Sequence, residues 1–144
     1  AYERAIETYR RTIEMGSRHP NTLLGMGDAH ALLGRQAEAR SYYRQALEIL
    51  ASSPWRQDEE WLGLEAQCLA HLGRGSEALA TIRIALEQAP DSAQLAYDAA
   101  LVATVVGELG FAEEQRRRAL EMGISPRWFT LPFFSGLPPP TPDR

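Results

Sequence analysis

LLGRQAEARSYYRQAL at residues 32–47 and HLGRGSEALATIRIAL at residues 71–86 are two versions of one pattern. Each has Leu-Gly-Arg, then Glu-Ala, then apolar residues three and four positions apart that end in Ala-Leu. Glycine ends a helix because it adopts positive φ without a Cβ clash, and the spacing after it is that of one helix face. Each stretch therefore predicts a turn between two helices. One such hairpin cannot bury its apolar face alone, so we expect several to stack.

The composition is typical of one globular domain. Of 144 residues, 44% are hydrophobic and 24% are charged. The formal net charge is −4, so no basic surface indicates nucleic acid as a partner. All 15 cationic residues are Arg, which favours a bacterial gene rich in G and C. The longest mostly apolar run, 99–106, is too short for membrane insertion. The sequence starts within a helical pattern, so we interpret it as a fragment, with a cytoplasmic location as the expectation.

The pattern recurs with a period of 34 residues. Four equivalent alanines, at positions 5, 39, 78 and 112, are separated by 34, 39 and 34 residues. The five additional residues fall at 54–58, in a loop between hairpins, where a stacked array tolerates insertions. Small residues also recur where paired helices should cross, at Gly27, Ala66 and Ala100.

This arrangement resembles the tetratricopeptide repeat family over about residues 1–124. Tyr9, Tyr43 and Ile82 stand at the large position of the second helix, whereas Arg116 departs from the pattern. The resemblance implies an all-α, right-handed superhelical solenoid of antiparallel helix pairs with a short C-terminal capping helix. We divide the chain into a half repeat (1–19), full repeats (20–53, 59–92 and 93–124), an apolar capping segment (125–137) and a Pro-rich tail (138–144).

The resemblance also implies a concave groove, lined by the first helix of each pair, that binds a protein or peptide partner. Its apolar and acidic side chains suit an extended or helical peptide with basic and apolar residues, whereas a carboxylate would be repelled. We expect the carboxylates of Asp28 and Asp98 to face solvent. An ordinary solvated face is the alternative interpretation. The candidate groove residues are Asn21, Leu24, Asp28, Leu32, Glu60, Leu64, Gln67, His71, Gln94, Tyr97, Asp98 and Leu101, with Gly25, Gly63 and Val105 on the same faces.

No catalytic, cofactor or metal site is predicted. The histidines, His19, His30 and His71, lie in a loop and on two different helices, without a second ligand at metal spacing. We expect His30 to be packed and hydrogen-bonded, and Cys68 to be a buried thiol. The sequence has no GxSxG, HExxH, P-loop or GxGxxG motif, so we expect no enzyme. Arg116–Arg118 is the only basic run, and we expect it to pair with nearby Glu side chains.

Several alternatives stay open. The aromatic segment with Trp128, Phe129 and Phe133 should fold back onto the final helix near Ala112, Ala119 and Leu120, or else serve as a docking motif. The leading function is a non-catalytic interaction scaffold. One rival is an accessory or regulatory domain of a larger enzyme or regulator. The other is self-association through the N-terminal half repeat, whose missing first helix would expose apolar side chains.

Overall fold

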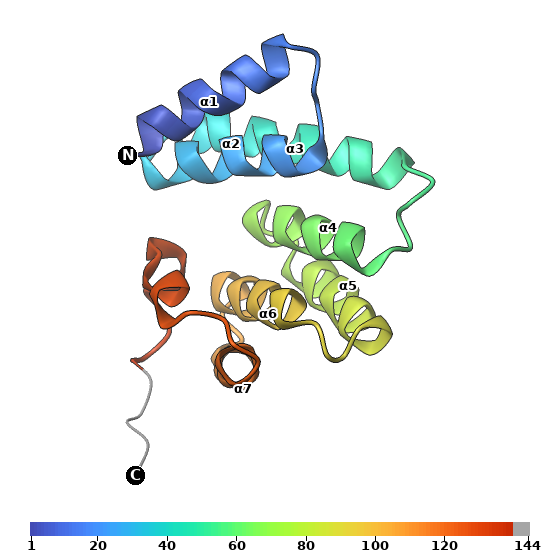
Figure 1. Cartoon of the computed structure of the whole chain (residues 1–144), viewed down its shortest axis with the longest axis vertical. Coiled ribbons are helices and arrows are strands. Elements are labelled where there is room, and N and C mark those ends of the chain that lie inside the picture. Colours follow the sequence, from blue (N-terminus) through green and yellow to red (C-terminus); the bar gives the residue numbers. More distant parts are fainter. Residues whose placement is uncertain (140–144) are drawn as a thin grey trace.

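Helical hairpins dominate the computed structural model, which describes residues 1–139 (Figure 1). Over that range the chain forms seven α-helices, two short 3₁₀ helices and no strand. The prediction for the Pro-rich tail lies mostly outside the described residues. The helices are α1 (Tyr2–Glu14), α2 (Pro20–Leu32), α3 (Gln36–Ser52), α4 (Glu59–His71), α5 (Gly75–Gln88), α6 (Ala93–Val106), α7 (Leu109–Glu121), η1 (Pro126–Thr130) and η2 (Pro132–Phe134).

The two echoed stretches form the turns that their glycines predict. Gly34 joins α2 to α3 with a φ of 77°, and Gly73 joins α4 to α5 with a φ of 79°. A side chain would be strained at these angles. The helices of each pair pack against one another, and successive pairs stack through α3 on α4, α4 on α6 and α5 on α6. The chain is therefore an all-α solenoid of helix pairs (Figure 1).

Small residues stand where the paired helices cross. Ala39, Ala78 and Ala112 are completely buried, one in the second helix of each pair. At Gly27 in α2, a Cβ atom would lie 2.5 Å from the ring of Tyr43 in α3. Only hydrogen fits there, so the large ring of one helix packs against the backbone of its partner. This contact explains the small residues of the repeat pattern.

Side chains cap two of the helix starts. The Ser92 hydroxyl accepts a hydrogen bond from the Leu95 amide and caps α6. The His19 imidazole accepts one from the Asn21 amide and caps α2. Asp58 occupies the N-cap position of α4, but its carboxylate makes no capping hydrogen bond. Glu59 and Glu60, in the first turn, supply negative charge at that positive helix end instead.

The capping helix predicted after Ser125 is wrong in form. The segment makes two 3₁₀ helices that are separated at Leu131, whose ψ of 143° is extended. Pro132 disfavours the helical conformation of the residue before it and has no amide hydrogen to donate. A continuous helix is therefore interrupted at this position.

The aromatic segment also packs on a different helix from the one predicted. Its main contact is with α6, not with α7 (Figure 1). The rings of Phe129 and Phe134 lie 5.4 and 5.6 Å from that of Tyr97 on α6. Phe134 is only 3% exposed, whereas Trp128, which we expected to be buried, is 49% exposed. Half of the side chains of α6 are both buried and apolar, so this helix offers an apolar surface on which the segment packs.

The apolar face of the first helix is partly covered. Ile6 is buried, and Tyr2, Tyr9 and Ile13 are half-buried on the side of α1 that packs against α2. The outer side carries Glu7, which forms ion pairs of 3.2 Å with both Arg10 and Arg11. Helix α2 thus covers part of the apolar surface on which the self-association hypothesis depends, whereas Met15 after α1 is 87% exposed, and self-association stays a prediction.

The basic run pairs largely as predicted. The Arg116 guanidinium lies 2.8 Å from the Glu113 carboxylate, and that of Arg117 lies 3.4 Å from Glu121. Arg118 instead donates a 2.8 Å hydrogen bond to the Pro90 carbonyl. The Arg116 side chain is almost wholly buried at the position where the repeat pattern expects an apolar residue. Its charge is paired there with the Glu113 carboxylate.

Two other side chains were predicted to be buried. Cys68 is completely buried, and burial raises the pKa of its thiol. His30 is packed, with its ring 5.4 Å from that of Tyr42, but its Nδ1 has no hydrogen-bond partner among the described residues. The expectation of a hydrogen-bonded His30 is therefore not met at this atom.

Candidate binding groove

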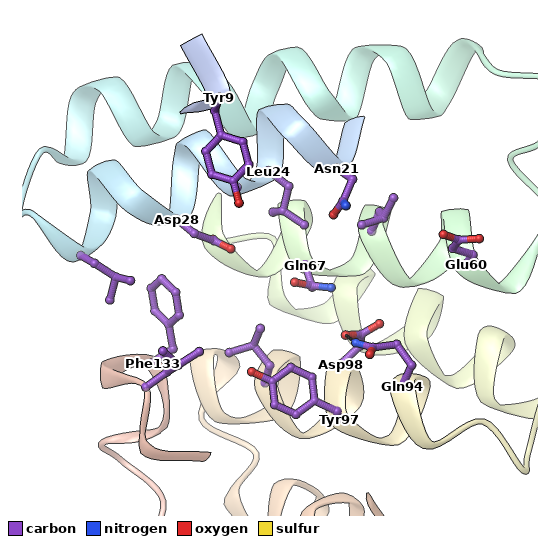
Figure 2. Close-up of a pocket in the computed structure, with 15 residues that line it drawn as sticks. Tyr9, Asn21, Leu24, Asp28, Glu60, Gln67, Gln94, Tyr97, Asp98 and Phe133 are labelled. Atoms are coloured by element: carbon purple, nitrogen blue, oxygen red, sulfur yellow. Dashed lines mark hydrogen bonds between the residues drawn. The ribbon is translucent and has the colours of Figure 1, made fainter. Parts of the chain in front are cut away.

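The first helices of the three hairpins, α2, α4 and α6, enclose a cavity of about 510 Å³ (Figure 2). Eleven of the twelve candidate groove residues line it, and His71 is the exception. Asn21, Glu60 and Gln94 mark one end of the cavity, where the three helices begin. The structure thus brings together side chains that lie up to 80 positions apart in the sequence, from Asn21 to Leu101. The remaining predicted residues that line it are Leu24, Asp28, Leu32, Leu64, Gln67, Tyr97 and Asp98.

His71 lies beneath the groove surface instead of on it. Its ring stacks on that of Tyr43, with centroids 4.6 Å apart and planes 7° apart, and the Phe133 ring lies 4.9 Å away. Its side chain is only 7% exposed. Burial lowers the pKa of this imidazole to about 4, so His71 is neutral near pH 7. His71 is on the inner helix α4, as the repeat pattern predicts, but aromatic neighbours from α3 and the C-terminal segment cover its ring.

Three cavity residues were missed by the sequence analysis. Tyr9 comes from α1, and Leu131 and Phe133 come from the C-terminal aromatic segment. A Cβ atom on Gly25 would lie 2.5 Å from the Tyr9 ring, so this glycine makes room for the phenol on the groove surface. The lack of a side chain at Gly25 was the signal in the sequence that another side chain, that of Tyr9, could occupy this part of the groove. No repeat pattern covers residues 125–137, so the sequence held no signal for the direction in which Phe133 points.

Asp28 is the most connected polar residue of the groove. Its Oδ1 accepts a 2.9 Å hydrogen bond from the Tyr43 hydroxyl, and the same oxygen lies 3.5 Å from Nε2 of His71. The side chain is 27% exposed, so the expectation that it faces solvent is wrong. Burial raises the pKa of its carboxyl to about 7, against the opposing effect of the Tyr43 hydrogen bond. The ring of Tyr43 and the adjoining core remove the water that a surface carboxylate would have.

Asp98 is buried on the opposite wall. The residue is 8% exposed, and its Oδ1 accepts a 2.9 Å hydrogen bond from the Gln94 amide. A Cβ atom on Gly63 would lie 3.2 Å from Oδ2 of Asp98, so α4 approaches this carboxyl closely. Burial raises the pKa of Asp98 to about 7, and Glu60 nearby contributes in the same direction. The expectation that Asp98 faces solvent is also wrong, because the close contact between α4 and α6 encloses it.

The charge of the cavity is of one sign. Asp28, Glu60 and Asp98 line it, and no cationic side chain lines it among the residues that the structure describes. Two of these carboxyls are largely enclosed, and each accepts one hydrogen bond from a neighbour in the described part of the chain. Apolar side chains, among them Leu24, Leu64 and Leu101, separate them. Such a surface can receive a cation that is flanked by apolar groups.

Neither a metal site nor a membrane span is found in residues 1–139. No three His, Cys, Asp or Glu side chains in this range lie close enough together to hold a metal ion. No helix in the same range is both long enough and apolar enough to cross a membrane.

A match to a known family covers the first part of the solenoid. Residues 2–54, which include α1, α2 and α3, match the model of the tetratricopeptide repeat family. Beyond this segment, α4–α7 continue the same stacking of helix pairs. No curated protein matches the chain.

Two solved structures are similar to this chain at low sequence identity. One is described as YrrB, a TPR protein with an unusual peptide-binding site; it is 21% identical, with a TM-score of 0.48. The other is described as the MamA RS-1 ArsTM double mutant; it is 19% identical, with a TM-score of 0.47. The similarity covers 88% and 85% of this chain, respectively. It covers 62% of the YrrB chain and 66% of the MamA chain, less than two thirds of either.

Proposed function

We propose that this chain is a non-catalytic interaction scaffold whose groove binds a peptide with basic and apolar side chains. The observation that carries the proposal is the cavity of about 510 Å³, which three carboxyls and no described cationic side chain line. Its size is within the range of sites that hold small ligands or short peptide segments. The leucines on all three helices provide apolar contact between the acidic positions.

The length of the groove corresponds to that of a short extended peptide. From Asn21 to Leu32 the groove follows eleven residues of α2, which corresponds to about 17 Å. An extended chain covers that length with about five residues. We therefore propose a segment of about five residues in extended conformation.

The enclosed carboxyls would favour cationic ligands more than surface carboxylates do. A cation next to Asp28 or Asp98 replaces the water that burial removed and stabilises the ionised form. An ion pair in this partly enclosed site is screened less by salt than one on the surface. Selectivity for basic peptides then comes from the carboxyls of Asp28 and Asp98 on the two sides of the groove. Glu60, at the end where the inner helices begin, adds electrostatic attraction as a basic peptide approaches.

A peptide array tests the proposal. It would hold seven-residue peptides that combine one Arg or Lys with two Leu or Phe, and a matched set in which Glu replaces each basic residue. The fluorescently labelled chain should bind members of the basic set and leave the acidic set unbound. Equal binding to both sets, or to neither, would count against the groove as a receptor for basic peptides.

A pair of variants locates the binding on the molecule. Leu64→Arg places a cation within the groove and should abolish binding of the basic peptides. Ile84→Arg is the matched control, because Ile84 is 48% exposed on α5 and does not line the cavity. Circular dichroism should show the same helical content for both. Loss of binding in the Ile84 variant instead would place the site on the other side of the solenoid.

A further inference from the structure

The C-terminal aromatic segment closes one end of the groove. Leu131 and Phe133 line the cavity, and the Phe133 ring lies 4.9 Å from that of His71, the last residue of α4. Figure 2 shows Phe133 on the side of Asp28, away from Asn21, Glu60 and Gln94. The groove is therefore open where the three inner helices begin and closed near the ends of α2 and α4.

This closure is anchored outside the cavity. Phe134 and Leu137 are 3% and 7% exposed, and neither lines the groove. The Phe134 ring packs against those of Phe129 and Tyr97, at 5.0 and 5.6 Å. The Tyr97 hydroxyl also donates a 3.4 Å hydrogen bond to the Trp128 carbonyl. A ligand in the groove leaves these anchors in place, so the segment is a wall of the site and not a plug that a ligand must displace.

The closed end presents a carboxyl with incomplete hydrogen bonding around it. Asp28 accepts one hydrogen bond, from Tyr43. The neighbouring Nε2 of His71 is buried, lies 3.5 Å from Oδ1 of Asp28 and has no hydrogen-bond partner among the described residues. Tyr9 adds a phenol to the cavity lining from α1. The titratable groups around Asp28 include Tyr9, Tyr43, Cys68, His71 and Tyr97, and none of these is cationic at neutral pH.

We propose that this closed end binds the free α-amino group of a peptide, with Asp28 as its counter-ion and Leu131 and Phe133 as the wall for the first side chain. This inference rests on the proposed function and adds which end of the peptide is held and where. A chain cannot continue through the wall, so a chain end fits there. The following residues leave along the groove toward Asn21 and Glu60. A terminal ammonium carries three donors, which suits Asp28 together with the Tyr9 hydroxyl.

Three small molecules test the inference without knowledge of the natural partner. L-leucinamide has a free α-amino group and an apolar side chain, N-acetyl-L-leucinamide lacks the amine, and Nα-acetyl-L-lysinamide carries its cation on a side chain. In NMR titrations, L-leucinamide should shift the signals of Phe133 and of the backbone at Asp28, with a dissociation constant on the order of 1 mM. N-acetyl-L-leucinamide should bind at least about tenfold more weakly, because the ion pair is lost. Equal binding of the two leucine compounds, or tighter binding of the lysine compound, would overturn the inference.

A matched pair of variants identifies the counter-ion. Asp28→Asn should weaken L-leucinamide binding at least about tenfold, whereas Asp91→Asn should leave it within about twofold, because Asp91 is exposed and does not line the cavity. The chemical change is the same in both variants. Phe133→Ala should also weaken binding, with Trp128→Ala as the control because Trp128 does not line this cavity. Amide spectra report whether each variant is folded, and equal losses in both Asp variants would overturn the assignment.

The outcome separates this inference from the proposed function. If array peptides bind equally well with free and acetylated amino ends, and L-leucinamide does not bind, the groove is a receptor for basic side chains and the inference fails. If L-leucinamide binds at Phe133 but no basic peptide binds anywhere, the amine site stands and the broader proposal fails.

Discussion

The Tyr43 hydroxyl donates a 2.9 Å hydrogen bond to Oδ1 of Asp28, which connects the core of one hairpin to the surface of the groove. The Tyr43 ring lies at a close helix crossing, against Gly27, and stacks on His71 of the next hairpin. One side chain therefore sets the approach of α2 to α3, contacts α4 and orients a carboxyl in the cavity. Fold and candidate site share this residue, so changes at its hydroxyl should affect both.

We predict that Tyr43→Phe lowers the free energy of unfolding by about 1 kcal/mol, the usual net value of one hydrogen bond. The ring remains and keeps its contact with Gly27, so the helical content should not change. The same substitution removes a bond that favours the ionised form of Asp28, so the pKa of that carboxyl should rise further. Urea unfolding measures the first effect, and the NMR titration of the Asp28 carboxyl measures the second.

Tyr42→Phe is the matched control for that measurement. Tyr42 is the neighbouring tyrosine on the same helix, half-buried, and its hydroxyl makes no hydrogen bond among the described residues. Its removal should change the stability by less than about 0.5 kcal/mol. Equal losses at positions 42 and 43 would show that the Asp28 hydrogen bond does not contribute to stability.

A second prediction concerns pH. The pKa values of Asp28 and Asp98 are raised to about 7 in the folded chain, from 3.8 for an unperturbed aspartate. Between about pH 4 and pH 7 the folded state therefore binds more protons than the unfolded state, and stability falls as the pH rises. His71 acts in the opposite direction: its pKa is lowered to about 4, so its contribution falls as the pH drops below 6.5.

The double variant Asp28→Asn with Asp98→Asn isolates the carboxyl contribution from that of His71. It should have nearly the stability of the original chain at pH 4 and become progressively more stable than it up to about pH 7. Above that value the difference should be constant, because both carboxyls are then ionised in both states. Urea unfolding at five pH values measures the difference, and a difference that does not depend on pH would show that these carboxyls are not perturbed.

The sequence predicted the parts of this molecule that the repeat encodes. The repeat pattern placed Ala39 and Ala78 at buried crossings, and the family resemblance, which puts the first helix of each pair on the concave side, identified eleven residues that line one cavity. It could not predict the burial of Asp28, because that depends on the Tyr43 ring from another helix. The position of Phe133 was likewise hidden, since a segment outside the repeat has no pattern to set its direction. Local periodicity identifies a face, whereas long-range contacts decide how much of that face reaches water.

The repeat register leads to a third prediction. Ala78→Leu should lower the free energy of unfolding by roughly 1–3 kcal/mol, because the residue is completely buried at a helix crossing and three added carbons overpack it. Ala80→Leu is the control two positions away on α5, where the side chain is exposed. It should change stability by less than about 0.5 kcal/mol. Thermal unfolding of both variants measures the contrast, and similar melting temperatures would contradict the crossing at Ala78.

The last prediction concerns the wall of the groove. Phe134→Ala should lower the free energy of unfolding by about 3 kcal/mol, the lower end for a buried phenylalanine, because its ring fills the space between Phe129 and Tyr97. Trp128→Ala, in the same segment, should cost less than about 1 kcal/mol, since half of that side chain is already in water.

With Trp55 and Trp61 replaced by Phe, the fluorescence of Trp128 should be intermediate between that of a buried and a free indole. Truncation after Gly123 should lower the melting temperature at least as much as Phe134→Ala and open the closed end of the groove. If the Phe134 variant and the truncated chain both have the melting temperature of the original chain, residues 125–137 do not pack on α6 in solution. The groove is then open at both ends.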